Sequence, residues 1–193
     1  MKKVMLLITV SGFLFYSSCS NNKTQKQGHN PDTRNETSTN TKKDDSIDFL
    51  SLGNELMQNE KLDFLKKGLP AKDFQNNLGK PEEESKPEIW AADGRFHQKV
   101  KYPSRGIELD LIQEKDSSFV INMITITSPC EFKTKKNIGI ESDYLAVKSA
   151  YKKYIDPKLS AEDQIVAGSI YGGIIFNFEN QKVKSIFIGA AAE

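Results

Sequence analysis

Few ionisable residues of this chain have a spacing that could support catalysis. Glu108 and Asp110 occupy alternate positions in an apolar-polar run, so a β-strand would place both carboxylates on one face, about 6–7 Å apart. Such a pair could act as acid and base, with His97 as the nearest histidine in the sequence. Their neighbours in the pattern are ordinary outward positions, and this favours a solvated face without catalytic function.

Recognised metal and phosphate motifs are missing from the sequence. The two histidines, His29 and His97, lie far apart, and no pair of His, Cys or carboxylate residues has a known ligand spacing. The acidic run Glu82–Glu84 is more typical of a charged loop than of a calcium site. Gly172-Gly173 lacks the loop-to-helix context of a phosphate cradle and indicates a bend or bulge. We therefore expect neither a metal nor a cofactor.

The first 18 residues have the parts of an export signal. Lys2 and Lys3 give a positive start, residues 4–16 form an apolar run, and two small residues precede Cys19. The run is short for a membrane-spanning helix, and no charged stop-transfer segment follows it. We predict that residues 1–18 are a signal peptide, and we leave them out of the fold prediction.

The run Tyr16-Ser17-Ser18-Cys19 resembles the lipobox of bacterial lipoproteins, although Tyr16 stands where Leu is usual. The resemblance implies that Cys19 is acylated and becomes the new amino terminus. Two or three acyl chains, at about 0.8 kcal/mol per buried methylene, would make anchoring effectively permanent. Ser20 follows Cys19, and no Asp resembles an inner-membrane retention signal there. The expected location is the outer membrane, facing the periplasm.

The cysteine count and the charge exclude some functions. Once Cys19 carries lipid, Cys130 has no disulfide partner in the chain, and a buried apolar role is favoured for it over a reactive thiol. Removing Lys2 and Lys3 from the 27 basic residues leaves 25 against 26 acidic residues. This balance argues against nucleic acid as a partner.

Residues 19–46 contain the acylation site and a predicted tether. From Ser20 to Asp45 the chain has no aliphatic or aromatic side chain, so it cannot bury enough apolar area to offset the entropy of ordering. A flexible segment of about 26 residues spans about 25–30 Å between its ends. We expect this disordered tether to hold the folded domain clear of the headgroups.

Residues 47–193 are predicted to form one α+β domain made of two similar halves, about 62–130 and 131–193. The first half opens with a short helix, for which Pro70 and Gly79 are the start and stop signals. The second helix opens near Ser142 and stops before Pro157. Its apolar stripe has the three- and four-residue spacing of a helix that lies on a sheet, with Tyr144, Val147, Tyr151 and Tyr154.

Each helix is followed by a predicted strand, near 96–102 or 164–171, and then by a hairpin. The two hairpins bury matching positions: Ile107, Leu109 and Leu111 match Ile174, Phe176 and Phe178, while Ile121, Ile124 and Ile126 match Val183, Ile186 and Ile188. The sequence thus predicts a weak tandem duplication of helix plus antiparallel meander, with the helices on one face of the sheet.

This repeated unit resembles the β-lactamase-inhibitor-protein-like fold, which small outer-membrane assembly lipoproteins share. The resemblance covers about Asp63 to Glu193 and rests on the two hairpins together with Gly68, Leu78-Gly79-Lys80-Pro81 and Gly139. It implies a sheet surface or helix edge that binds another protein, without cofactor or catalysis. The chain departs from the pattern at the Glu- and Lys-rich insertion from Glu82 to Glu88 and by two extra residues between Gly139 and Val147. No partner-binding residue is carried over.

A sheet with helices on one side leaves its other side open to a partner. Strand alternation places four apolar residues there, Ile112, Met123, Ile175 and Phe187, and such a patch is typical of a protein interface. Trp90 is a second candidate anchor. In the alternative, loops or the tail Ala190–Ala192 cover the four residues, and Trp90 belongs to the core.

The function predicted from the sequence is that of a non-catalytic, lipid-anchored envelope lipoprotein whose domain binds another envelope protein. One alternative is a periplasmic hydrolase or small-ligand-binding protein with a cleft between the halves, using Glu108, Asp110 and His97. Another alternative is an inhibitor or immunity protein.

Mass spectrometry of the natural protein tests the predicted anchor. We expect the intact mass to lack residues 1–18 and to include fatty acyl groups on Cys19, because cleavage and acylation together define a lipoprotein. Retention of Met1, or an unmodified Cys19 in protein that floats free after cell breakage, contradicts the prediction.

Overall fold

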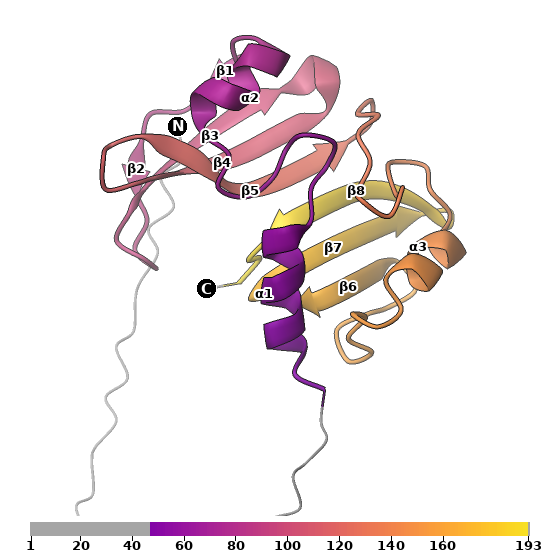
Figure 1. The fold of residues 1–193 in the computed structure, drawn as a ribbon. Coiled ribbons are helices and arrows are strands. Elements are labelled where there is room, and N and C mark those ends of the chain that lie inside the picture. The colour runs from indigo at the N-terminus through magenta and orange to yellow at the C-terminus, as the bar shows by residue number, and fades with distance from the viewer. Residues whose placement is uncertain (1–46, 193) are drawn as a thin grey trace, which may run out of the picture. The chain divides into compact units, whose positions relative to one another are not determined.

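The computed structural model describes residues 47–192, which form three helices and one antiparallel sheet of eight strands (Figure 1). The predicted α+β class is confirmed. The helices are α1 (Phe49–Asn59), α2 (Ala71–Leu78) and α3 (Tyr144–Ala150). The strands are β1 (Glu83–Glu84), β2 (Glu88–Ile89), β3 (Phe96–Tyr102), β4 (Ile107–Gln113), β5 (Phe119–Thr127), β6 (Gln164–Ser169), β7 (Gly172–Glu179) and β8 (Lys182–Gly189). The predicted signal peptide, Cys19 and the predicted tether lie outside the described residues.

The sheet consists of two three-stranded meanders that meet at its centre. The strand order is β1-β3-β4-β5-β8-β7-β6, and β2 also pairs with β3. The central contact between the meanders is the antiparallel pair β5 and β8, in which Ile124 lies opposite Ile188 and Ile126 lies opposite Ile186. These four isoleucines occupy matching positions in the two hairpins. The junction is therefore nearly symmetric, as a duplication requires.

Local irregularities of the sheet also occur at matching positions in the two halves. The β4–β5 register shifts between Asp110 and Leu111, and the β7–β8 register shifts at the matching place, between Asn177 and Phe178. The residue before each helix also bridges to the last strand of its own half, Pro70 to Val120 and Asp143 to Lys182. Bulges and isolated bridges are specific local geometry. Their repetition supports the duplication more strongly than apolar alternation does.

The helices pack on one face of the sheet, as predicted. The apolar sides of α2 and α3 enter the same core cluster as the inward residues of both meanders, through Phe74, Leu78 and Val147. The predicted second helix is too long, because α3 ends at Ala150 and turns follow it. Tyr151 and Tyr154 are buried all the same. The Tyr151 hydroxyl donates to Glu60 Oε2 at 2.9 Å, a long-range contact that sequence periodicity cannot indicate.

Helix α1 was not predicted, although it covers β6 and β7 (Figure 1). Asp48 caps its start by accepting from the Ser51 amide at 3.1 Å. Gly53, in the middle of the helix, lies against the backbone of the β6–β7 hairpin: a Cβ atom on Gly53 would stand 2.0 Å from the Gly172 carbonyl oxygen. The missing side chain of Gly53 thus permits a close helix-strand approach. Gly172-Gly173 follow the turn between β6 and β7, and the register shift of β7 lies further along, between Asn177 and Phe178.

Both edges of the sheet are covered by other parts of the chain. Along β6, Asp156 donates its amide to the Val166 carbonyl, and Gly168 donates to the Tyr154 carbonyl. Along β3, the short strands β1 and β2 pair with Val100–Lys101 and Phe96–His97. The insertion from Glu82 to Glu88 is therefore more than a charged loop, because it closes an edge. The strands that form the outer edge beside β3, β1 and β2, have only two residues each and give a strand from another chain little backbone to pair with.

No helix among residues 47–192 is long and apolar enough to cross a membrane.

The Gly53→Ala substitution tests the close contact of α1 with the sheet. We expect it to lower the free energy of unfolding by about 1–3 kcal/mol, because the methyl group overpacks against backbone that cannot move independently. Urea denaturation measures the loss, with Ser51→Ala on the exposed side of α1 as the control. Equal stability of Gly53→Ala and the unsubstituted protein contradicts the packing of α1 on β6 and β7.

Candidate functional site

The face of the sheet opposite the helices carries a continuous row of side chains across six strands. Register pairs connect Lys101 to Glu108, Glu108 to Thr125, and Thr125 to Phe187. The row continues through Ile175 to Val166 on β7 and β6. We call this surface the helix-free face. It changes from charged on β3 and β4 to apolar on β7 and β6.

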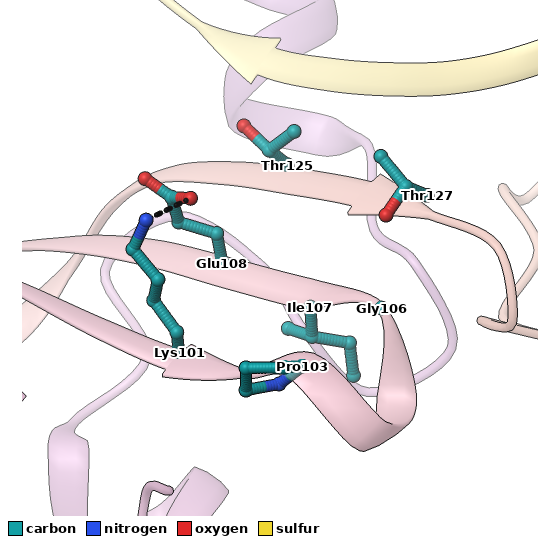
Figure 2. Close-up of a pocket in the computed structure, with 7 residues that line it drawn as sticks. All are labelled: Lys101, Pro103, Gly106, Ile107, Glu108, Thr125 and Thr127. Carbon is teal, nitrogen blue, oxygen red and sulfur yellow. Dashed lines mark ion pairs between the residues drawn. The ribbon is translucent and has the colours of Figure 1, made fainter. Parts of the chain in front are cut away.

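A pocket of about 300 Å³ opens on the charged part of the helix-free face (Figure 2). The Lys101 ammonium lies 3.0 Å from Glu108 Oε2, and both side chains are partly exposed. The hydrogen bond and the charge of Glu108 raise the pKa of Lys101. Thr125 and Thr127 lie on the neighbouring strand β5 (Figure 2). The remaining lining residues are Pro103, Gly106 and Ile107. The pocket offers one ion pair and hydroxyl groups.

The predicted apolar patch is only partly open to solvent. Ile112 is 7% exposed and Ile175 is 9% exposed, so the expectation that these two residues face solvent is wrong. Met123 and Phe187 are half-buried, and both lie against Gly189, whose lack of a side chain leaves room for them. Ile175 is flanked on the same face by Val166 and Phe187. The helix-free face is therefore closed to solvent at Val166 and Ile175, and Met123 and Phe187 remain partly accessible.

Ionisable groups cluster at the β2 end of the same face. His97 is 2% exposed, and its Nδ1 lies 2.8 Å from Asp110 Oδ2 while its Nε2 lies 3.1 Å from Asp93 Oδ2. The Trp90 ring is stacked on the imidazole, with centroids 3.8 Å apart. We call these residues, together with Asn122 and Lys67, the His97 cluster. The prediction that Asp110 is a solvated residue is wrong, because it is only 6% exposed.

Asn122 and Lys67 extend the His97 cluster across β5. Asn122 Nδ2 donates to Asp110 Oδ2 at 3.0 Å, and the Lys67 ammonium donates to Asn122 Oδ1 at 2.5 Å. Burial lowers the pKa of Lys67, while the charge of Asp110 opposes that shift. Among residues 47–192, Asp110 Oδ1 is the one fully buried side-chain polar atom without a hydrogen-bond partner. The hydrogen bonds of the buried Asp110 carboxylate therefore come from His97 and Asn122.

The His97 cluster holds its histidine in a fixed position. Each ring nitrogen of His97 lies within hydrogen-bond distance of a carboxylate, Nδ1 of Asp110 and Nε2 of Asp93. A backbone hydrogen bond from Arg95, followed by the hydrogen bond from His97, lowers the pKa of Asp93 and keeps it ionised. Both ring nitrogens are thus engaged in contacts within the protein. The arrangement suits the anchoring of Trp90 and the β2–β3 hairpin better than general base catalysis.

The structure brings together only two of the three residues of the predicted hydrolase site. His97 and Asp110 lie in contact. Glu108, two residues before Asp110 on β4, pairs instead with Lys101. A 570 Å³ depression lies at the connection between the halves, and its lining includes Cys130 but none of these three residues. Burial raises the pKa of the Cys130 thiol, which fits the predicted apolar role. Within residues 47–192, no group of three or more His, Cys or carboxylate side chains is placed to hold a metal ion.

Sequence reasoning missed three members of the His97 cluster. Asp93 lies four residues before His97, and this proximity was the one available signal. Asn122 reaches Asp110 because the register shifts in the β4–β5 pair. Lys67 comes from the segment before α2, which pairs with β5 through Gly68 and Ile121. Neither long-range contact can be predicted from the spacing of residues in the sequence.

Comparison of the chain with protein-family models, with curated proteins and with solved structures gave no match.

The Asp110→Ala and Glu108→Ala variants compare a buried hydrogen-bonded carboxylate with a partly exposed ion pair on the same strand. We expect Asp110→Ala to cost about 3–5 kcal/mol of unfolding free energy, because it leaves His97 and Asn122 buried without their acceptor. Glu108→Ala breaks only a partly exposed pair and should cost about 0–1 kcal/mol. Urea denaturation measures both values. Similar costs for the two variants contradict the assignment of Asp110 to a buried cluster.

Proposed function

We propose that the protein is a non-catalytic, membrane-anchored envelope protein whose domain binds another protein on the helix-free face. The observation that carries the proposal is the arrangement of accessible groups on this face, where Phe187 and Met123 lie beside Thr125 and the Lys101–Glu108 pair. A partly buried aromatic residue with a surrounding of polar and charged groups is typical of a binding interface.

The rest of the sheet supports this choice of surface. The other face is covered by helices α1, α2 and α3, and its apolar residues form the core. Both edges are paired with other segments of the chain. A partner strand therefore finds only the two-residue strands β1 and β2 at one edge, which favours contact through side chains of the helix-free face.

The membrane anchor in this proposal rests on the sequence of residues 1–19. The hydrolase alternative has one observation in its favour, the 2.8 Å contact between His97 and Asp110. Because both ring nitrogens of His97 face carboxylates, we propose a structural role for this contact. An inhibitor or immunity protein is a special case of the proposed binding function, since it also acts through a protein interface.

Site-specific photo-crosslinking in the envelope tests the proposal. With a photoreactive residue at position 125, we expect a discrete adduct with one protein. Phe187→Asp should then reduce adduct formation by about 30-fold, as for the loss of about 2 kcal/mol at an interface anchor. Ile175→Asp is a poor test, because Ile175 is buried and the variant is expected to unfold.

The control is Ile89→Asp, which replaces an exposed apolar residue at the β2–β3 hairpin and should leave the adduct unchanged. Thr125→Arg with the photoreactive residue moved to position 127 gives a second disruption that does not remove apolar packing. If both Phe187→Asp and Thr125→Arg are folded by circular dichroism and retain full adduct formation, the helix-free face is not the binding surface.

A further inference from the structure

Exposed lysines gather on and beside α3, on the helix side of the sheet. The set consists of Lys135, Lys136, Lys148, Lys152 and Lys153, all exposed. We call it the lysine patch. Lys148 lies on α3, Lys152 and Lys153 follow in the turns after it, and the other two come from the loop before the helix. Figure 1 shows α3 beside β6 and β7.

One lysine from the loop before α3 and one from the turns after it approach the same tyrosine ring. The Lys136 ammonium lies 5.6 Å from the centroid of the Tyr151 ring and 5.9 Å from that of Tyr154. The Lys153 ammonium lies 4.4 Å from the same Tyr154 ring. Two cations thus share one buried ring, although they are 17 positions apart in the chain. The lysine patch is a tertiary feature and does not follow from a charged run in the sequence.

The ammonium groups of the lysine patch form no close ion pair with the described residues. Within residues 47–192, none of its five ammonium groups lies within 4.0 Å of a carboxylate oxygen. The buried Glu60 accepts from the Tyr151 hydroxyl and from the Lys135 amide. Asp143, at the start of α3, pairs with Lys182 on β8. The ammonium groups therefore remain free to contact an external anion.

An exposed apolar side chain accompanies the lysine patch. Leu145 is 73% exposed, more than any other large apolar residue among residues 47–192. It lies three residues before Lys148 on α3, so the two side chains share a face of the helix. Lys148 and the protruding Leu145 make this face of α3 at once cationic and apolar.

This combination identifies the class of partner. Lysine is depleted at protein-protein interfaces, and the near-neutral chain lacks the overall charge of a nucleic-acid binder. Anionic lipid headgroups attract clustered lysines, and an apolar side chain at the same surface enters the boundary with the acyl chains. We propose that the lysine patch and Leu145 rest on the anionic surface of a membrane.

This contact would orient the domain. Because α3 packs against the core on the helix side, its contact with lipid would direct the helix-free face away from the bilayer. The proposal for the lysine patch does not depend on a protein partner at that face, but it rests on the membrane anchor of the proposed function. It concerns how the folded domain lies on a membrane to which the chain is already attached.

Fluorescence of the full chain in vesicles tests the contact. Trp90 is the one tryptophan of the sequence, so the double variant with Trp90→Phe and Leu145→Trp reports on position 145 alone. The chain is reconstituted into phosphatidylcholine vesicles with or without phosphatidylglycerol, each containing brominated lipid as the quencher. A matched variant with Trp90→Phe and Ile89→Trp places the reporter at another exposed apolar position.

We expect several-fold stronger quenching at position 145 in anionic vesicles than in neutral ones, and no such difference at position 89. Changing Lys136, Lys148, Lys152 and Lys153 to Gln should abolish the difference, since each lysine contributes about a fivefold factor to association with an anionic surface. High salt should have the same effect. The charge-matched control changes four exposed lysines of the first half to Gln: Lys72, Lys80, Lys86 and Lys115.

Three results would overturn the proposal: no quenching at position 145 in anionic vesicles, equal quenching in neutral vesicles, or equal loss in the lysine-patch and control variants. The first of these, together with a photo-crosslink from position 145 to an acidic protein, would assign the lysine patch to a protein partner. Far-UV circular dichroism verifies that each variant is folded. Because the crosslinking test uses position 125 and this test uses position 145, either proposal can fail without the other.

Discussion

The pairing of β5 with β8 is the contact on which the remaining structure depends. Ile124 and Ile126 of one meander lie opposite Ile188 and Ile186 of the other, and this pairing joins two three-stranded units into one sheet. A three-stranded meander with one helix has little apolar surface to bury by itself, whereas the joined sheet supports a common core. The same pairing sets Thr125 opposite Phe187. The helix-free face is thus continuous because the two halves share one register.

The two halves have diverged at the positions where their geometry is most alike. Both hairpins keep a register shift at the matching place. In the second half, Asn177 hydrogen bonds to Gln164 and Ser185, which gives a neutral polar ladder. In the first half, Asp110 at the equivalent position contacts His97 and Asn122 and gives a buried ionic cluster. One backbone arrangement therefore holds two kinds of polar network, and only the first includes an aromatic ring stacked over it.

The proposed surfaces lie on opposite sides of the sheet and differ in chemistry. The helix-free face combines half-buried apolar groups with one ion pair, which is suited to a shaped protein partner. The lysine patch has ammonium groups without a close ion pair and one protruding leucine, which is suited to a lipid surface that has no fixed shape. A domain that contacts a membrane with one side and a protein with the other can hold that protein at a defined distance from the bilayer.

Local sequence signals determined the parts of this protein that depend on residues close together in the chain. Alternation in 107–111 and 174–178 gave both hairpins and their inward faces, and Pro70 and Gly79 gave the ends of α2. Tertiary structure decided the rest. The Gly53 contact with Gly172 seats α1 on β6 and β7 from the other end of the chain. The buried state of Asp110 depends on a bulge and on Trp90 stacked over His97, and the lysine patch depends on a loop that brings Lys136 to Tyr154. Sequence periodicity reports which side of an element is apolar, but burial and charge clustering depend on which other elements cover that side.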